Sequence, residues 1–222
     1  MRYFEFALTP GQPLIRSARV EHRGEMRLGG FDAPWRPFTS VQHVSIHPPG
    51  FVWDATFRMA PVVSLRVRDS YLDGVGAMQG KLAGLIPVVD QSGLPELSAG
   101  ALQRYLAEAA WFPTALLPGD GLSWDAIDST RGRAVLTDHE TTVSLEFQFA
   151  PNGAIERTYT PARYREVAGA YVPTPWAGAH RSYAQVHGMQ VPMEGEVEWI
   201  LPEGRLPVWR GRIQRIEYEL GC

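Results

Sequence analysis

Polar and apolar residues alternate along several long runs of this sequence, and the alternation constrains the fold more than any other feature. The clearest run is VVSLRVRDSY, residues 62–71, in which Val63, Leu65 and Val67 alternate with polar residues. Successive side chains of a β-strand point to opposite faces, so this pattern is typical of a strand with one buried and one solvated face. Residues 14–28 show the same period, which indicates a mainly β protein.

Turn-forming residues divide the sequence into short elements. Its 18 prolines and 22 glycines are scattered along 222 residues, which favours many strands joined by tight turns over a helical bundle. Pro151-Asn152-Gly153 separates two alternating runs and predicts a hairpin. The glycines of DGVGAMQGKLAG, residues 73–84, favour a loop. The segment carries no GxGxxG or Walker pattern, so nothing in it indicates phosphate binding.

A helix is expected near the middle of the chain, from about Ser98 to Ala110. Ser98 is a suitable N-cap. Apolar residues recur on one helical stripe, namely Leu102, Tyr105, Leu106 and Ala109. Arg104 and Glu108 are four residues apart and can form an ion pair. Pro113 should end the helical segment, because proline disfavours the helical conformation of the residue before it.

These elements predict a single domain over residues 1–222. It would contain a short N-terminal helix, about five strands, the central helix at about 98–110, and about five further strands. Antiparallel strands on both sides of one helix favour a mainly β, α+β fold. We expect a strongly curved antiparallel sheet, or open half-barrel, closed by the central helix.

Charge and hydropathy patterns exclude several classes of partner. The formal net charge is -3 with both signs interspersed, so nothing indicates nucleic-acid binding. No run reaches the roughly 18 apolar residues of a transmembrane segment, and the N-terminus lacks a signal-peptide pattern. As written the sequence indicates a cytoplasmic protein, although a longer parent chain could carry an upstream signal or anchor. Cys222 is the sole cysteine, so no intrachain disulfide is expected.

Metal-binding and nucleophilic motifs are absent from the sequence. The six histidines show no HxxxH helix or HxH pair. His43 and His47 would lie about 13 Å apart on an extended strand, too far to share a metal ion. There is no GxSxG motif for a nucleophilic serine. We therefore predict neither a metal site nor a cofactor.

Three carboxylates are candidate catalytic residues. Asp54 follows Trp53, Asp69 precedes Tyr71 on a predicted strand, and Glu108 lies beside the apolar stripe of the helix. A carboxylic acid held against aromatic rings has a raised pKa and can act as a general acid or base. In this alternative the protein is an enzyme for an apolar substrate, with Tyr71 or Arg104 orienting a polar group. The simpler interpretation is structural, because Arg104 and Glu108 can pair with each other on the helix.

Tryptophan is unusually frequent, and it directs attention to a binding site. Seven tryptophans lie on separate segments, at positions 35, 53, 111, 124, 176, 199 and 209. They could fill the core, or several could line an apolar cavity between the curved sheet and the helix. The predicted ligand-binding residues are Phe51, Trp53, Leu65, Tyr71, Tyr105, Trp111 and Trp124.

Several segments together resemble a known family. They are RYLAEAAWFPTALLP, PGFVWDATF, VRDSYLDGVGAM, GLSWDAID and HGMQVPMEGEVEW, and they span nearly the whole chain. The sequence is identified as a member of an uncharacterised bacterial family, a domain of unknown function. The order of strands, helix and strands is also similar to the half-barrel of periplasmic lipoprotein carriers. That second resemblance implies a curved antiparallel sheet closed by helices over an apolar cavity.

The favoured interpretation is noncatalytic binding of a lipid or other apolar small molecule between the curved sheet and the central helix. The enzyme acting through carboxylates is the alternative. A structural or interaction module that associates through an exposed edge strand is a third possibility.

Overall fold

The computed structural model describes residues 2–119 and 121–221. Cys222 and Asp120, which belongs to the Pro-Gly-Asp-Gly turn at 118–121, lie outside the described residues. The helices are α1 (Arg2–Ala7), α2 (Pro95–Glu108) and the short 3₁₀ helices η1 (Ala109–Trp111) and η2 (Pro113–Leu116). The strands are β1 (Ile15–Arg27), β2 (Trp35–Ser45), β3 (Gly50–Ala60), β4 (Val63–Leu72), β5 (Val75–Leu82), β6 (Ile86–Ser92), β7 (Leu122–Ala126), β8 (Arg131–Asp138), β9 (Thr141–Phe149), β10 (Ile155–Val167), β11 (Ala170–Val186), β12 (Met189–Leu201) and β13 (Gly204–Leu220).

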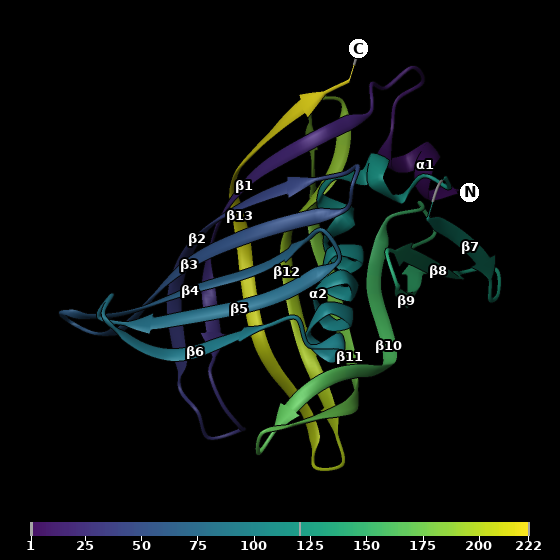
Figure 1. Ribbon diagram of the computed structural model, residues 1–222. Coiled ribbons are helices and arrows are strands. Elements are labelled where there is room, and N and C mark those ends of the chain that lie inside the picture. Colours follow the sequence, from purple (N-terminus) through teal and green to yellow (C-terminus); the bar gives the residue numbers. More distant parts are fainter. Residues whose placement is uncertain (1, 120, 222) are drawn as a thin grey trace.

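Within the described residues, thirteen strands form one antiparallel sheet (Figure 1). The chain starts in the middle of the sheet at β1 and runs strand by strand to one edge at β6. It then crosses through α2 to the opposite edge at β7 and returns to the middle, where β13 pairs with β1. This topology confirms the predicted antiparallel, mainly β fold.

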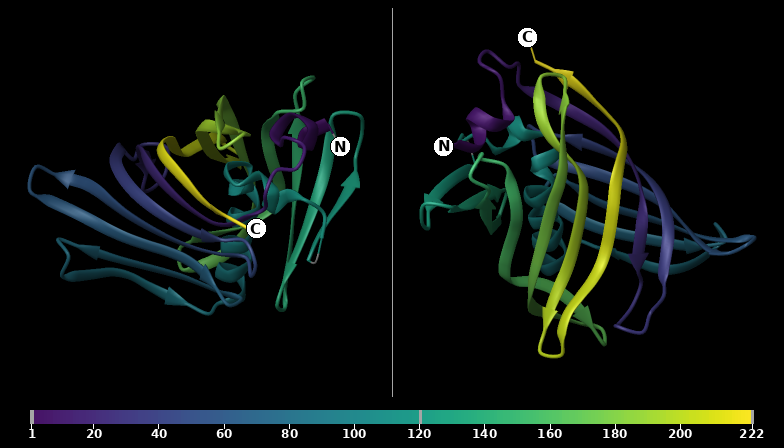
Figure 2. Two further views of the ribbon diagram at one scale, coloured as in Figure 1. Left: turned by 90° about the horizontal axis from the view of Figure 1, so that it is seen from above. Right: turned by 180° about the vertical axis from the view of Figure 1, so that it is seen from behind.

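Helix α2 lies inside the curve of the sheet. It packs against β3, β4 and β5 of the N-terminal half and against β9 and β10 of the C-terminal half. Seen from above, α2 stands between these two halves (left view of Figure 2). The helix therefore closes a curled half-barrel, as the sequence predicts.

Strand β3 shows how the alternating pattern builds the concave face. Phe51, Trp53, Ala55 and Phe57 are all buried, whereas the residues between them are more exposed. The same alternation buries alternate residues of β9 against α2. One face of the sheet thus supplies the core, which is the arrangement expected of an antiparallel sheet with one solvated side.

The segment interpreted as a glycine-rich loop is in fact mostly strand β5. Its glycines hide the strand pattern, and Gly76 is required because α2 approaches very closely. A Cβ at Gly76 would lie 2.8 Å from the backbone of Leu97. The Gly76 N–H also donates a hydrogen bond to Ser98 Oγ at 2.9 Å. A close helix contact, not a flexible loop, therefore explains this glycine.

The predicted start of the helix at Ser98 is wrong. Helix α2 begins at Pro95, with Leu94 in the N-cap position and no side-chain cap. Proline suits the first turn of a helix, since the N–H it lacks would be unpaired there. Ser98 lies inside the helix, where its hydroxyl binds β5 and so cannot serve as the cap. At the other end Phe112, before Pro113, is not helical, as expected.

The last three strands are long, with 17, 13 and 17 residues in β11, β12 and β13. A row of glycines crosses the sheet here: Gly24 pairs with Gly211, which pairs with Gly195. A Cβ at Gly211 would lie 2.5 Å from the Trp209 ring, and one at Gly24 would lie 2.2 Å from the Arg210 carbonyl oxygen. The glycine row therefore lets the Trp209 ring and the backbone of β13 lie closer to the neighbouring strands than a Cβ atom would allow.

In the part of the chain that the structure describes, the helices are too short or too polar for any of them to span a bilayer.

We expect Gly24→Ala to destabilise the protein by about 1–3 kcal/mol, because a backbone oxygen cannot move aside as a side chain can. Gly100→Ala in α2 is the matched control. A Cβ at Gly100 meets nothing within 4 Å, and alanine is the better helix former by about 1 kcal/mol. Urea denaturation of both variants measures the two effects. Equal stability of Gly24→Ala and the wild type would contradict the close approach.

Candidate functional site

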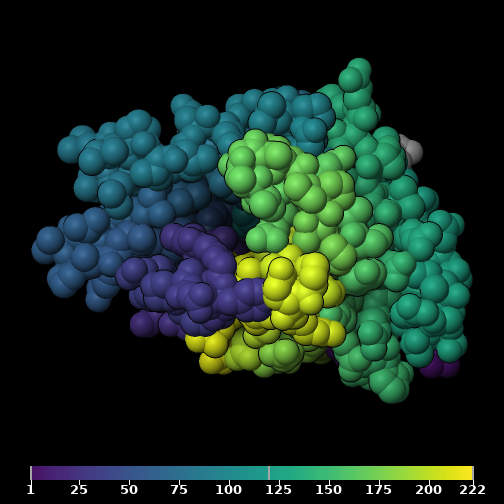
Figure 3. Space-filling view, turned by 90° about the horizontal axis from the view of Figure 1, so that it is seen from below, coloured from purple at the N-terminus to yellow at the C-terminus, as the bar shows by residue number. Residues whose placement is uncertain are grey.

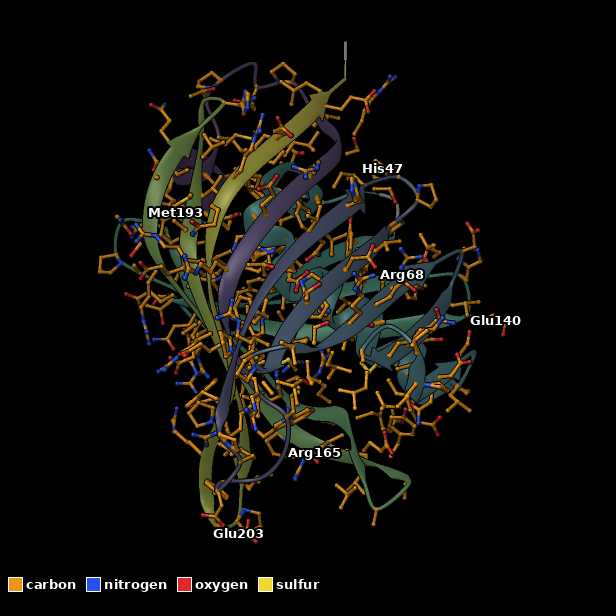
Figure 4. The ribbon with its side chains drawn as sticks, turned by 90° about the vertical axis from the view of Figure 1, so that its left-hand side faces the viewer. His47, Arg68, Glu140, Arg165, Met193 and Glu203 are labelled. Atoms are coloured by element: carbon orange, nitrogen blue, oxygen red, sulfur yellow. The ribbon has the colours of Figure 1, made fainter. Side chains whose placement is uncertain are left out.

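An apolar pocket of about 530 Å³ lies between α2 and the concave face of the sheet. Seen from below, a hollow is visible between the blue N-terminal strands, the purple β1–β2 loop and the green and yellow hairpins (Figure 3). Arg165, which lines the pocket, lies toward this lower end of the molecule (Figure 4). The volume is in the range of small-molecule sites in proteins.

One face of α2 forms the first wall of the pocket. Its lining residues recur at helical spacing, namely Leu97, Gly100, Ala101, Arg104, Ala107, Glu108 and, just beyond the helix, Trp111. Gly100, Ala101 and Ala107 carry little or no side chain, so the helix surface is shallow there. Small residues on this face therefore leave space that a row of leucines would fill.

Strands β10, β11 and β12 form the facing wall, where glycines again leave room. Gly178 of β11 and Gly195 of β12 both line the pocket. A Cβ at Gly178 would lie 2.7 Å from Thr158 Oγ1, and one at Gly195 would lie 3.6 Å from the Trp111 ring. The wall is thus built of neighbouring strands with little side-chain volume at its centre.

Aromatic rings supply much of the apolar surface. Five of the seven tryptophans line the pocket, namely Trp53, Trp111, Trp176, Trp199 and Trp209. The rings of Trp111 and Trp209 lie 6.2 Å apart, and the ring of Trp111 lies 4.8 Å from that of His22. Trp111 and Trp209 therefore pack on each other at the pocket wall.

Three of the seven predicted ligand-binding residues, Trp53, Leu65 and Trp111, line this pocket. The other four are placed elsewhere. Phe51 and Tyr105 are buried in the core, and Tyr71 donates a hydrogen bond to Asp138 that joins β4 to β8. Trp124 lies on β7, outside the pocket lining.

Trp124 belongs to a set of bonds that fix the segment after α2. Its indole N–H donates to the Leu116 carbonyl at 2.9 Å, and its ring packs on Phe147. The Tyr218 hydroxyl donates to the Trp111 carbonyl, and the Ile15 N–H donates to Thr114 Oγ1. Strands β1, β7 and β13 therefore hold residues 109–117 in place, and this fixes Trp111 at the end of the pocket.

Arg104 of α2 is the centre of an ion network on the pocket wall. Its Nη1 donates to Asp69 of β4 at 2.6 Å and its Nε donates to Glu108 at 2.7 Å. Gln42 of β2 donates to the other Glu108 oxygen at 2.6 Å. The guanidinium carbon also lies 4.8 Å from the centre of the Phe51 ring. The predicted Arg104–Glu108 pair is confirmed, and the network ties the helix to two strands.

Electrostatics within the network favour the charged guanidinium. Burial lowers the pKa of Arg104, but the carboxylates of Glu108 and Asp69 outweigh burial and the net shift is upward. Asp54, the third candidate acid, lies apart from them. It pairs with Arg68 on the outer face of the sheet, where Arg68 points toward the viewer in Figure 4. Two of the three candidate carboxylates thus converge, and both already have a cationic partner.

Four residues of the pocket lining carry buried polar atoms without a hydrogen-bond partner among the described residues: Trp111, Thr158, Arg163 and His180. Burial, with the nearby charge of Arg104, lowers the pKa of Arg163 to about 10, so its guanidinium stays charged at neutral pH. Burial lowers the pKa of His180 to about 4, so its ring is neutral.

Sequence reasoning did not select Arg163, His180 or the tryptophans of the last strands. Trp176, Gly178 and His180 are spaced by two on β11, so their shared face is visible in the sequence. Nothing in the sequence shows that β10 places Arg163 beside them, because a register shift follows Thr160. Within residues 2–119 and 121–221 no three His, Cys, Asp or Glu side chains are grouped to hold a metal ion.

Comparisons with known proteins place the chain in a family but give it no activity. The model of DUF6920, a family of unknown function, matches residues 1–218, which confirms the resemblance seen in the sequence. A LolA-superfamily protein from Nitrosomonas europaea is similar in structure, with 10% identity, a TM-score of 0.45, and coverage of 100% of this chain and 92% of that one. No curated protein matches the sequence.

A second solved structure, a beta-barrel-like protein of the domain of unknown function DUF1849 from Brucella abortus, is 9% identical with a TM-score of 0.34. The similarity covers 94% of this chain and 100% of that chain.

Arg104→Met should destabilise the protein by about 3–5 kcal/mol, because it leaves two largely buried carboxylates without their cation. Arg68→Met is the matched control, since it breaks a pair whose side chains are 58% and 48% exposed. Exposed pairs contribute about 0–1 kcal/mol. Chemical denaturation of the two variants gives the comparison, and similar losses from both would contradict a structural role for the Arg104 network.

Acid should destabilise the protein through its buried histidines. Burial, together with Arg104, lowers the pKa of His22 to about 3, and burial lowers that of His180 to about 4. Below about pH 6.5 the unfolded chain binds protons at these two positions and the folded chain does not. The free energy of unfolding therefore falls as the pH falls, by about 1.4 kcal/mol per pH unit for each histidine, until the folded pKa is reached.

This acid dependence is measured by urea denaturation between about pH 6 and about pH 5. His180→Leu removes one titrating group, so its slope should be shallower than that of the wild type by about 1.4 kcal/mol per pH unit. Parallel slopes would show that His180 is protonated equally in both states.

Proposed function

The chain belongs to the DUF6920 family of unknown function, and we propose that it binds a lipid or another apolar small molecule in the pocket between α2 and the curved sheet. The observation that carries this proposal is the pocket itself, about 530 Å³ in volume and lined mainly by tryptophan, aliphatic and small residues. Concave apolar sites with a few polar groups are typical of small-molecule binding in proteins. Trp53, Leu65 and Trp111 would contact the ligand.

The shape of the pocket favours an elongated apolar group. Lining residues follow α2 from Glu96 to Glu108 and on to Trp111, so the pocket runs along the helix. A helix rises about 1.5 Å per residue, and this stretch of the wall is therefore about 20 Å long. An extended hydrocarbon chain can lie along such a wall and cover the tryptophan faces opposite.

The carboxylates give less support to an enzyme. Asp69 and Glu108 do line the pocket together, as the alternative requires. Both, however, accept hydrogen bonds from Arg104, and Glu108 accepts another from Gln42. A general acid or base needs a proton that it can exchange with a substrate, and these oxygens are already engaged with donors of the protein. Binding without catalysis is therefore the function we propose.

Gly100→Phe tests the proposal by filling the pocket. Gly100 lines the pocket and a Cβ there meets nothing within 4 Å, so the ring can extend into the open space without displacing the helix. Phenylalanine is also a better helix former than glycine, so the variant should fold. We expect its affinity for the fluorescent probe N-phenylnaphthylamine to fall about tenfold or more, the loss of about 1.4 kcal/mol of binding energy.

Gly100→Ala is the control, and it should bind the probe as the wild type does. Thermal melting confirms that both variants are folded. Wild-type affinity in Gly100→Phe would contradict binding in this pocket. Native mass spectrometry of the protein purified from cells, before and after organic extraction, gives an independent measurement, because a bound molecule adds mass that extraction removes.

A further inference from the structure

Polar atoms on the β10–β11 wall of the pocket have no partner within the described part of the chain. Thr158 and Arg163 belong to β10 and His180 belongs to β11, and we call these three residues the polar wall. In each of them at least one buried side-chain nitrogen or oxygen lacks a hydrogen bond. Such atoms are costly in an apolar setting, and in native proteins most are satisfied. A group that enters the pocket is the natural partner.

The strand register brings the polar wall together. Thr158 pairs with Gly178, which lies two residues before His180 on β11. Trp176 lies two residues before Gly178, and the Arg163 guanidinium carbon lies 5.0 Å from the centre of the Trp176 ring. A Cβ at Gly178 would lie 2.7 Å from Thr158 Oγ1 and 3.6 Å from the Trp176 ring, so these two side chains flank the open position at the glycine. His180 lies on the same face of β11 as Trp176, because each is two residues from Gly178. The polar wall is thus one patch over two neighbouring strands.

Charge distinguishes Arg163 from the other arginine of the pocket interior. Arg104 pairs with Asp69 and Glu108, the two acids whose charge also acts on Arg163, and neither of them forms a salt bridge with Arg163. Arg163 Nη1 is buried with no acceptor among the described residues and faces a pocket it helps to line. A guanidinium in such a place pairs best with a carboxylate or phosphate, which can accept two parallel hydrogen bonds.

We propose that the ligand is an amphiphile with an acidic, oxygen-bearing head group, which pairs with Arg163, and an apolar chain, which lies along α2. This inference rests on the proposed function and names the chemistry of its ligand. Thr158 donates to the same head group from the polar wall. Trp111 adds an indole N–H farther along the pocket, and the neutral ring of His180 both donates and accepts.

The test compares oleate with methyl oleate, which has the same chain and no charge. Each competes with N-phenylnaphthylamine for the wild-type protein and for Arg163→Met, in which an apolar side chain replaces the guanidinium over Trp176. We expect the wild type to bind oleate about tenfold or more tightly than methyl oleate, as a charge-assisted hydrogen bond would give. Arg163→Met should bind the two lipids equally, with unchanged affinity for methyl oleate.

Two further variants locate the effect. Arg163→Lys keeps the charge and should retain part of the preference for oleate. Arg157→Met removes a positive charge from the same strand, where Arg157 pairs with Glu198 away from the pocket lining. It should keep the full preference. Acetate and inorganic phosphate, which carry an acidic group without a chain, should not displace the probe at the concentrations at which oleate does.

The outcomes separate this inference from the proposed function. Equal wild-type affinities for oleate and methyl oleate would overturn the acidic head group and leave lipid binding intact, and this result needs no variant that must fold. An unchanged preference in Arg163→Met would overturn the role of Arg163. Displacement by acetate or phosphate alone would indicate a small-anion site. Failure of both lipids and the probe to bind the wild type would refute the proposed function itself.

Discussion

The space inside the curved sheet that the described strands form is larger than helix α2 can fill, and the other features of the molecule follow from this mismatch. The helix has 14 residues, so it is about 21 Å long, and it touches both halves of the sheet. A protein interior is normally packed as densely as an organic crystal. Here glycines and alanines on α2, β11 and β12 keep the interior open, and the tryptophans line what remains.

Electrostatic pairing then divides the polar residues of the interior into two groups. Asp69, Arg104 and Glu108 pair with one another and hold α2 against β4, and Gln42 adds a bond from β2 to Glu108, so these interactions stabilise the position of the helix. Arg163 and the other residues of the polar wall have no such partners among the described residues. The first group explains why the helix stays in the half-barrel, and the second gives the pocket a chemical preference.

The sequence predicted the parts of the fold that depend on local pattern. The alternating run at 62–71 coincides with β4 (Val63–Leu72) to within one residue at each end, and the Pro-Asn-Gly turn at 151–153 connects β9 to β10. Prediction failed where tertiary contacts overrode the pattern. Gly76 looked like part of a loop because nothing in the sequence shows that α2 packs on β5. Ser98 looked like a helix cap because serine is common at that position. Its hydroxyl instead accepts a hydrogen bond from the Gly76 N–H of β5, a contact between two elements that the local sequence does not show.

By itself the sequence determined the fold class, since alternation with a period of two decides which residues of a strand are buried. The sequence also indicated the excess of tryptophan and the ion pair between Arg104 and Glu108, which are four residues apart on a helix. Only the tertiary structure decided which tryptophans face the pocket. It placed Tyr71 in a hydrogen bond that joins β4 to β8 and Trp124 in one that holds η2, whereas Trp176 and Trp209 line the pocket. It also placed Arg163 where the charges of Asp69 and Glu108 act on it, although both acids already form salt bridges with Arg104. Such relations depend on the register between strands and on the path of the chain through α2, and a local pattern carries no information about either.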